Sequence, residues 1–444
     1  MAGNKSINRR QFIKKAVGTT AGVIGFPYIV RSSALGKDGA VAPSNRIALG
    51  CIGMGGQGTG NMRGFLTKDK IQVVAVCDVD ERHLKRALKL VKDKYGNNDC
   101  AGYKDFREII ERRDIDAVSI ALPDPWHAIP AIMACRVGKD IYSEKPLAYT
   151  ISEGRAICDA VKRYGVVWQT GSWQRSVSHF RLACELVRNG RIGEVKLAKV
   201  GLPYGNGISG VDWTGGRLGT ELVKVPDGFD YDMWLGPSPF KPYAHGRCHW
   251  NWRWISDYSG GQITDWAGHH IDIAHWGMNA DRLSPVEIKN PSAVFPNGKE
   301  GLYDTPMGYY FECNYAEGFR IIVADARQNT MGVRFEGSEG WIHVNRGGID
   351  AHPKSILKSA IKPNEIHLYE SNDHTQNFID CIASRAETIT PAETAHHSIM
   401  VGHLGTAAIK LGRDLKWDPA SERFINDEDA NRLLSRPMRR PWHL

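Results

Sequence analysis

A chain of 444 residues is long enough for two folded domains, and 42% hydrophobic and 24% charged residues is the composition of an ordinary globular protein. The formal net charge is +8, and six positive charges lie before residue 35, where no acid occurs: Lys5, Arg9, Arg10, Lys14, Lys15 and Arg31. The remainder therefore carries about +2 (8 − 6), which excludes the strongly basic surface of a nucleic-acid-binding protein.

The N-terminus has the pattern of an export signal. The arginine pair Arg9-Arg10 is followed by Phe12, a weakly apolar stretch over 16–30 and small residues at 32–34. This pattern resembles a twin-arginine signal. A disordered basic tail is the alternative, whereas a membrane anchor is disfavoured because the apolar run is short and contains glycines and Pro27. We expect a signal over 1–34, a linker over 35–45, export by the twin-arginine machinery and a periplasmic or secreted location.

The nine cysteines include no C-x-x-C pair, and several fall inside predicted buried strands and helices. We therefore expect core residues rather than a disulfide framework. This suits a protein that folds in the reducing cytosol before export. No stretch after the signal is apolar and long enough to span a bilayer.

A glycine-rich turn lies between two apolar runs, which cover 47–52 and 71–77. Its glycines at 53, 55 and 58 have the spacing G-x-G-x-x-G. In a dinucleotide site the first glycine makes the turn, the second admits the diphosphate, and the third lets helix and strand pack closely. The amides that open the following helix then face the phosphates. An ordinary glycine-rich loop is the alternative, but the flanking strands favour the nucleotide site.

The second apolar run ends on Asp78, 25 residues after Gly53 (78 − 53). A carboxylate at this place can accept both hydroxyls of the adenosine ribose, which favours NAD over NADP. The sequence therefore predicts NAD as the cofactor. The predicted NAD-binding residues of this stretch are Gly53, Met54, Gly55, Gly56, Gln57, Gly58 and Asp78.

The chain divides into two structural classes near residue 171. Over 46–171, predicted strands and helices alternate, which indicates an α/β domain with a doubly wound parallel sheet of the Rossmann type. Over 172–390 there are many strand-like runs and few helices, which predicts an α+β domain with a mostly antiparallel open sheet. Helices would cover one face of that sheet, and the free face predicts a homo-oligomer, a dimer or tetramer. A helix near 391–413 and a basic arm complete the chain to residue 444.

Three motifs in order carry a family resemblance: the glycine fingerprint with Asp78, then Pro123…His127 with Glu144-Lys145-Pro146, then Gly260-Gly261…Asp265…His269. Together they resemble the family of glucose–fructose oxidoreductase, inositol dehydrogenase and the MocA proteins (Gfo/Idh/MocA), and the twin-arginine pattern is typical of its secreted members. The resemblance implies an NAD(P)-dependent sugar or cyclitol oxidoreductase. It also implies that a minority of members are glycoside hydrolases that use bound NAD without net redox change.

The resemblance implies that Lys145 reaches the nicotinamide ribose and a substrate hydroxyl, with Pro123, His127 and Glu144 also at the cofactor. Local pairing of Lys145 with Glu144 is the alternative, and His127 could instead begin a helix. Pro146 disfavours helical backbone at Lys145, which predicts an extended, defined pose.

Asp265 and His269 are four residues apart, so on a helix they share one face. Oxidation of an alcohol needs a base for the hydroxyl proton, and histidine suits this near neutral pH. We predict His269 as the base, Asp265 as its partner and Lys145 as electrostatic support. Asp265 could instead cap a helix, and His270 competes as base but faces away by helical phasing. Metal ligation by Asp265, His269, Asp272 and His275 is possible by spacing, but we expect no metal.

Aromatic residues precede the Asp265 motif in unusual number. Trp250, Trp252 and Trp254 alternate, so a strand would place their rings on one face as a sugar platform beside Arg253, with core packing as the alternative. The remaining candidates around the cleft are Gln169 at the cofactor, Trp173 and Tyr204 at the substrate, and the nearby aromatic residues Trp213, Trp234 and Tyr243.

The expected function is transfer of hydride between a sugar or cyclitol ring carbon and a tightly held nicotinamide cofactor outside the cytoplasm. The alternative is an NAD-dependent glycoside hydrolase or lyase that acts through a transient 3-keto sugar. This route would differ from the usual pair of catalytic carboxylates. A second alternative is a non-catalytic sugar-binding protein.

Overall fold

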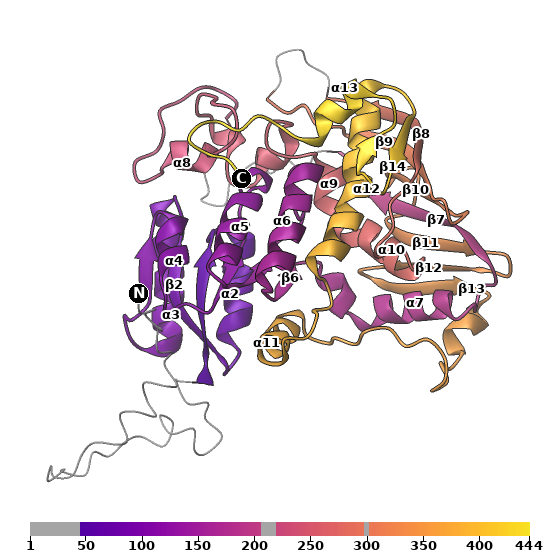
Figure 1. The fold of residues 1–444 in the computed structure, drawn as a ribbon, viewed down its shortest axis with the longest axis horizontal. Coiled ribbons are helices and arrows are strands. Elements are labelled where there is room, and N and C mark those ends of the chain that lie inside the picture. The colour runs from indigo at the N-terminus through magenta and orange to yellow at the C-terminus, as the bar shows by residue number, and fades with distance from the viewer. Residues whose placement is uncertain (1–44, 206–218, 297–301) are drawn as a thin grey trace, which may run out of the picture. The chain divides into compact units, whose positions relative to one another are not determined.

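The computed structural model describes residues 45–205, 219–296 and 302–444. The predicted signal, all but the last residue of the predicted linker, and Trp213 lie outside the described residues. Within Ile47–Leu444 the chain builds two sheets, one on each side of Figure 1. None of the described helices combines the length and the apolar character that a membrane crossing requires.

The first sheet is six-stranded and parallel, in the order β3-β2-β1-β4-β5-β6. Helices lie on both of its faces, and the predicted doubly wound α/β fold is confirmed. The strands are β1 (Ile47–Ile52), β2 (Ile71–Cys77), β3 (Ala101–Tyr103), β4 (Ala117–Ile120), β5 (Asp140–Ser143) and β6 (Trp168–Thr170). The helices are α2 (Gly56–Leu66), α3 (Glu81–Tyr95), α4 (Phe106–Glu111), α5 (Ala128–Arg136) and α6 (Ile151–Tyr164).

The faces of this sheet are covered by different helices because its strands are apolar on both sides. Phe65 of α2 and Leu84 of α3 share one core with Leu49 and Val73. The helices α4, α5 and α6 share the other core with Ile52 and neighbouring strand residues. The strand order reverses between β1 and β4, and ligands of such sheets bind at that point, beyond the carboxyl ends of the strands.

The second sheet has nine strands in the order β13-β12-β11-β7-β10-β9-β8-β14-β15. All its pairs are antiparallel except β7 with β10, which confirms the predicted mostly antiparallel sheet. Its strands are β7 (Val195–Leu202), β8 (Glu287–Val294), β9 (Gly308–Asn314), β10 (Arg320–Asp325), β11 (Gly332–Gly337), β12 (Trp341–Asn345), β13 (Gly348–His352), β14 (Leu415–Asp418) and β15 (Arg423–Phe424).

Three helices pack on this sheet: α7 (Ser178–Arg188), α10 (Asp272–Gly277) and α12 (Ala392–Leu411). Glycines let two of them approach closely. A Cβ at Gly277 would lie 2.4 Å from the ring of Phe335, and one at Gly405 would lie 2.3 Å from the ring of Phe311. The helix α11 (His374–Ser384) instead packs on the first sheet, where Phe378 is fully buried.

The described residues between β7 and β8 form helices and turns, where the sequence predicts a strand through the three tryptophans. That prediction is wrong. Residues Asn251–Trp254 form a 3-10 turn in which the amide of Ile255 donates to the carbonyl of Trp252. The Arg253 guanidinium lies 4.6 Å from the Trp250 ring and 4.5 Å from the Trp252 ring. The tryptophan rings therefore pack on Arg253 and in a separate aromatic core, and not on one face of a sheet.

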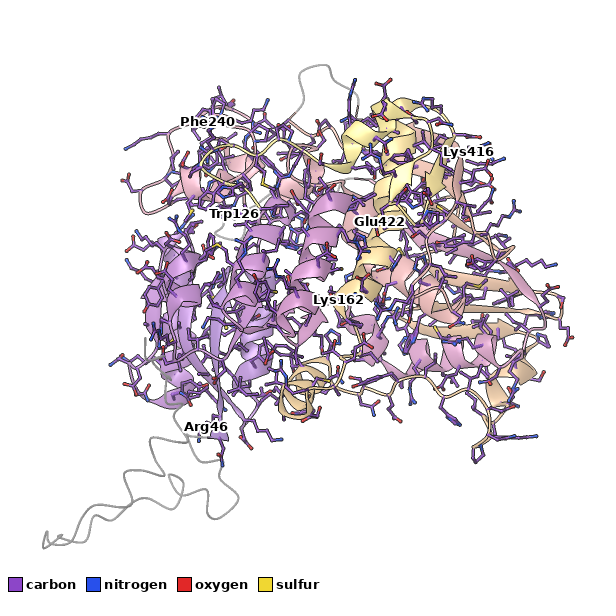
Figure 2. The ribbon with its side chains drawn as sticks, in the orientation of Figure 1. Arg46, Trp126, Lys162, Phe240, Lys416 and Glu422 are labelled. Atoms are coloured by element: carbon purple, nitrogen blue, oxygen red, sulfur yellow. The ribbon has the colours of Figure 1, made fainter. Side chains whose placement is uncertain are left out.

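That core lies in residues 229–258, here called the aromatic segment. Its members are Phe229, Tyr231, Trp234, Leu235, Tyr243, Cys248, Trp252, Ile255 and Tyr258. The segment includes α8 (Tyr231–Leu235) and packs on the nucleotide domain. The amide of Asp230 donates to the carbonyl of Val79 at 3.0 Å. Trp126 lies beneath the segment, whereas Phe240 is on its outer side and 64% exposed (Figure 2).

The C-terminal arm runs back across the molecule to the same place (Figure 1). Arg436 donates to the carbonyl of Pro125 at 3.0 Å, and Arg439 donates to the carbonyl of Gly236 at 2.9 Å. Trp442 packs edge-on against Trp126, with 4.6 Å between the ring centroids. The arm thus touches both the nucleotide domain and the aromatic segment. Eight of the nine cysteines are buried, as expected for core residues, and no disulfide bond joins any of them.

Candidate active site

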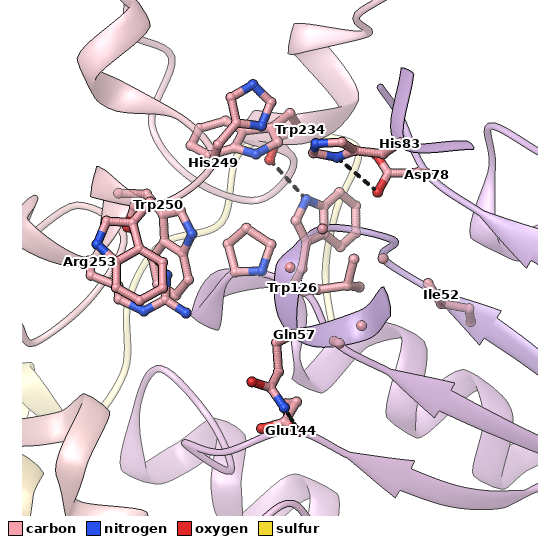
Figure 3. A pocket seen from close by; sticks show the side chains of 18 of the residues that line it. Ile52, Gln57, Asp78, His83, Trp126, Glu144, Trp234, His249, Trp250 and Arg253 are labelled. Atoms are coloured by element: carbon pink, nitrogen blue, oxygen red, sulfur yellow. Dashed lines mark hydrogen bonds and ion pairs between the residues drawn. The ribbon is translucent and has the colours of Figure 1, made fainter. Parts of the chain in front are cut away.

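A pocket of about 580 Å³ opens at the carboxyl ends of β1, β2 and β4. One end is lined by the glycine turn and the start of α3, and the other by the aromatic segment and the helices that follow it. Figure 3 shows the close approach of these segments, with Gln57 and Glu144 below and Trp250 and Arg253 at one side. A cleft of this kind between two domains fits a dinucleotide together with a small substrate.

The glycine turn has the geometry that a diphosphate requires. Gly53 has φ +86°, and a Cβ there would lie 2.3 Å from the carbonyl oxygen of Ala121. A Cβ at Gly58 would lie 1.8 Å from the carbonyl oxygen of Gly53. A Cβ at Gly55 would meet no atom within 4 Å, since that side of the turn faces the open pocket. The backbone can therefore approach a phosphate at Gly55, with the amides of α2 beyond it.

Asp78 lines the pocket and also holds the glycine turn in place. Its Oδ2 accepts from the Met54 amide at 2.6 Å, and its Oδ1 accepts from the Asp80 amide at 2.8 Å. His83 Nδ1 lies 3.4 Å from Oδ2. Each carboxylate oxygen can accept a further hydrogen bond, so Asp78 can still receive ribose hydroxyls. Gly56 and Gln57 line the pocket. Met54 is buried and does not line it, and its amide donates to Asp78.

The walls beyond Asp78 come from residues for which the sequence motifs give no signal. His83, Trp126, Phe229 and His249 line this part of the pocket, together with Trp234 of the predicted aromatic stretch. Trp126 is fixed because its indole N–H donates to the carbonyls of Met233 at 3.0 Å and Trp234 at 3.1 Å. The aromatic segment therefore covers the nucleotide end of the pocket.

At the other end of the pocket, the Asp265 carboxylate accepts hydrogen bonds from two cationic side chains. Lys145 Nζ donates to Asp265 Oδ1 at 2.9 Å and to the Asp265 carbonyl at 2.9 Å. Arg253 Nε donates to the same Oδ1 at 3.2 Å. Burial favours the neutral acid, but Lys145 and Arg253 outweigh it and hold the pKa of Asp265 below its usual value. Gly268 lets the lysine pass, since a Cβ there would lie 2.9 Å from Lys145 Cβ.

His269 lies in the pocket wall beside this cluster and is 5% exposed. Burial, followed by the nearby charges of Lys145 and Arg346, lowers its pKa well below the usual histidine value, so the ring is neutral at neutral pH. Its Nδ1 has no hydrogen-bond partner among the described residues. That nitrogen is itself buried, and a neutral imidazole can accept a proton. The competing His270 turns away, with its Nδ1 3.0 Å from the carbonyl oxygen of Gly201.

The prediction that Asp265 orients His269 is wrong. The helix α9 (Gln262–Trp266) is followed by a π-helical turn over Ala267–Ile271, which widens the backbone and alters the one-turn relation between the two residues. No hydrogen bond joins their side chains, and the Asp265 carboxylate bonds Lys145 and Arg253 instead.

Three predicted site residues point elsewhere. The ring nitrogens of His127 lie 2.6 and 2.8 Å from the carbonyl oxygens of Pro146 and Leu122, and the residue joins these two loops without lining the pocket. Gln169 is fully buried and donates to the carbonyl of His374. Tyr204 lies outside the pocket, under the guanidinium of Arg327.

Pro123, Glu144 and Trp173 do line the pocket. Glu144 accepts from Asn61 Nδ2 at 2.8 Å and Gln57 Nε2 at 3.1 Å, so it braces the helix that follows the glycine turn. Burial raises the pKa of this carboxyl.

Two of the four residues whose spacing suggested a metal site, Asp272 and His275, have other partners. Asp272 accepts from the buried Arg175 at 2.8 Å, and His275 Nε2 lies 2.7 Å from the hydroxyl of Tyr315. Their side chains are therefore used in the packing between α10 and its neighbours, away from Asp265 and His269.

Arg346 is a pocket residue that the sequence prediction missed. It lies in the turn between β12 and β13, about 80 residues after His269, and its guanidinium stacks between the rings of Trp173 and Trp266. The available signal is the sequence Arg346-Gly347-Gly348 between two strand-like runs, which marks a hairpin turn but not a site.

Comparison with known families gives two matches that together cover most of the chain. Residues 47–172 match the Gfo/Idh/MocA oxidoreductase family, NAD-binding Rossmann fold, and residues 181–444 match its C-terminal alpha/beta domain. The chain belongs to the Gfo/Idh/MocA oxidoreductase family. This confirms the predicted family and its NAD-binding domain.

Individual relatives are more distant. The alpha-N-acetylgalactosaminidase of Shewanella oneidensis is 30% identical over 211 residues, which are 43% of this chain and 44% of that protein. A glycosyl hydrolase family 109 protein of Shewanella pealeana is 30% identical over 206 residues, again 43% and 44%. The chain thus matches less than half the length of these relatives.

Solved structures agree with the fold. The aldose-aldose oxidoreductase of Caulobacter crescentus, complexed with glycerol, has a TM-score of 0.59 and 19% identity over 84% of this chain and 99% of that one. A levoglucosan dehydrogenase, complexed with NADH and L-sorbose, has a TM-score of 0.60 and 18% identity over the same shares. At these identities the likeness concerns the fold alone.

Proposed function

We propose that the protein is an NAD-dependent oxidoreductase that transfers hydride between a ring carbon of a sugar or cyclitol and a tightly held cofactor. The observation that carries this proposal is the neutral, buried His269 beside the Lys145–Asp265–Arg253 cluster, in the same pocket as the glycine turn. A proton acceptor and a fixed positive charge at the far end of a dinucleotide site are what oxidation of an alcohol requires.

The chain supplies the proton chemistry and the positioning. Bound NAD would supply the hydride acceptor and, once reduced, the hydride donor. His269 would take the hydroxyl proton of the substrate while the carbon is oxidised. Lys145, held by Asp265, would donate to the substrate oxygen and stabilise the negative charge that develops on it. Trp173 and Trp250 would pack on the sugar and exclude water.

The test begins with the cofactor that the purified protein carries. After denaturation, mass and absorbance identify the released nucleotide, and we expect NAD. The intact holoenzyme is then mixed with a panel of sugars, cyclitols and glycosides while absorbance of the reduced nicotinamide is followed. A stoichiometric burst with one of them is the expected result. Absence of any nicotinamide change with every compound, despite bound NAD, would contradict the proposal.

A second candidate function is suggested by the relatives named as glycosyl hydrolase family 109 proteins. In that route transient oxidation at ring C3 acidifies the proton on C2, elimination breaks the glycosidic bond, and the hydride is returned after water adds. His269 could take the hydroxyl or the C2 proton. Repeated release of nitrophenol from a nitrophenyl glycoside without any added acceptor indicates this hydrolase. A non-catalytic sugar-binding protein would give neither a burst nor nitrophenol.

We also propose that the protein is exported by the twin-arginine pathway and works as a homo-oligomer. The arginine pair at residues 9 and 10 and the cysteines, which form no disulfide bonds, support export of a protein folded with its cofactor. A fusion of residues 1–45 to a reporter, compared with an Arg9→Lys/Arg10→Lys control, tests the location. Light scattering tests the oligomer, and a monomer mass would contradict that part of the proposal.

A further inference from the structure

Arg346 stands in the pocket wall without a carboxylate partner. Its guanidinium carbon lies 4.8 Å from the Trp173 ring centroid and 4.4 Å from the Trp266 ring centroid, so the two rings flank its faces. Its Nε donates to the side-chain oxygen of Gln174 at 3.2 Å. For its two Nη nitrogens the structure gives no acceptor among the described residues. Four N–H bonds in the plane of the guanidinium are thus available.

Other arginines stacked on tryptophan in this protein differ in this respect. Arg334 lies 4.1 Å from the Trp341 ring centroid and also donates to Glu336 at 2.8 Å. Arg253 stacks on two rings and donates to Asp265. At Arg334 and Arg253, stacking on tryptophan is thus combined with a hydrogen bond to a carboxylate, and no carboxylate of the described residues takes that place at Arg346.

The charge balance at this end of the pocket also favours an anionic ligand. Lys145, Arg253 and Arg346 are the described cations that line this end, with Lys104 at the nucleotide end, and Asp265 is the carboxylate that pairs with Lys145 and Arg253, which leaves a surplus of up to two positive charges (3 − 1). Glu144 is turned to Asn61 and Gln57 at the nucleotide side. Asp124 is buried and does not line the pocket, but its carboxyl interacts with the charges of Lys145 and Arg253 and offsets part of the surplus when it is ionised. A neutral sugar would leave this surplus uncompensated, since its hydroxyls carry no charge.

The position of Arg346 relative to the base is fixed by one side chain. Gln174 accepts from Arg346 Nε with its oxygen and donates to the carbonyl of His269 at 3.3 Å with its nitrogen. The aromatic rings prevent the guanidinium from tilting. A planar fork held in this way presents two parallel N–H groups, the arrangement that binds a carboxylate or a sulfate in bidentate fashion.

We propose that the substrate is an acidic sugar, whose carboxylate or sulfate ester is received by Arg346 between Trp173 and Trp266. This inference rests on the proposed function, because it takes the His269 end of the pocket as the sugar site. It names the substrate class of that site, a uronic acid or a sulfated sugar, and leaves the ring carbon that is oxidised to His269 and Lys145.

The experiment compares matched sugars on the holoenzyme. Methyl glucuronide and methyl glucoside differ only at C6, and glucose 6-sulfate provides the sulfate arm against glucose; galacto and manno counterparts complete the panel. Binding is measured by calorimetry and turnover by nicotinamide reduction. We expect one acidic arm to exceed its neutral match in kcat/KM by at least about tenfold. The arm that responds distinguishes carboxylate from sulfate.

The variant Arg346→Gln should lower the ratio of acidic to neutral kcat/KM by roughly 10- to 100-fold, the usual size of a lost charge-assisted pair. Arg346→Lys should restore part of it. Arg334→Gln, which removes a stacked arginine outside the pocket, is the matched control and should keep the ratio. Equal handling of acidic and neutral sugars by the wild type, or an unchanged ratio in Arg346→Gln, would overturn the inference alone. If no sugar of either kind binds or reacts, the proposed function is wrong as well.

Discussion

The two ends of the pocket use different parts of the chain for different work. At the nucleotide end the backbone does most of the binding, through a glycine turn, a helix N-terminus and one carboxylate that braces the turn. At the His269 end, charged and aromatic side chains surround the space, and the backbone mainly places them. The comparison teaches that cofactor retention and catalysis should be separable by mutation: changes at one end should alter binding of NAD, and changes at the other should alter rate.

The largest effect is expected from Gly55→Val. The new side chain would occupy the open space in front of the turn where a diphosphate must approach, and its Cβ would meet no protein atom within 4 Å. The protein should fold and contain no NAD after purification, and activity should be lost. Mass spectrometry of the released nucleotide measures this. Gly60→Val, an exposed position on the same helix with equally open space, should retain NAD. Full NAD occupancy in Gly55→Val would refute the placement of the diphosphate.

The counterpart at the other end is His269→Ala. Loss of a general base typically lowers the rate by about 10²- to 10⁴-fold. NAD content should be unchanged, because the nucleotide end is untouched. Single-turnover nicotinamide reduction measures the rate, and mass spectrometry the content. His270→Asn, which alters the neighbouring ring bonded to Gly201, should cost stability more than rate. Near-normal turnover in His269→Ala would show that His269 is not the base.

The pH profile distinguishes two buried groups. The pKa of His269 lies well below its usual value through burial, so the base is already neutral above pH 6.5, and the loss of kcat/KM that comes from protonation of His269 should begin only below that pH. Burial, followed by repulsion from Asp265, raises the pKa of Asp124 to about 7. Asp124 should therefore give the wild-type kcat/KM profile a separate inflection near pH 7. That inflection should disappear in Asp124→Asn. If an inflection near pH 7 persists in that variant, another group titrates there.

The smallest effect is expected from Trp126→Phe. The variant keeps a ring in the wall but removes the donor to two carbonyls of the aromatic segment, a loss of about 1–3 kcal/mol in the packing of that roof. NAD should dissociate several-fold faster, with little change in the chemical step. Cofactor loss on dialysis and a thermal melt measure this. Trp341→Phe on the second sheet is the control. An unchanged dissociation rate would show that the roof does not retain the cofactor.

The same contrast explains how far prediction from sequence could go. The glycine turn, Asp78 and the alternation of strands and helices were predictable because each depends on neighbours in the sequence. The Asp265–His269 pairing failed, since a π turn and two distant cations, Lys145 and Arg253, compete for the carboxylate. The tryptophan strand failed because local stacking on Arg253 replaced pairing with another strand.

By itself the sequence determined the two-domain architecture, the NAD-binding turn and the identities of Lys145, Asp265 and His269 as candidates. Only the tertiary structure decided which groups meet: that Asp265 holds Lys145 and Arg253, that His127 and Gln169 bind backbone carbonyls instead of lining the pocket, and that Arg346 enters from a hairpin turn of the second sheet. The physical reason is the distance along the chain between the residues that interact. Turns and helix starts follow from the conformations of a few consecutive residues, whereas charge balance and burial depend on side chains brought together from segments far apart in the chain.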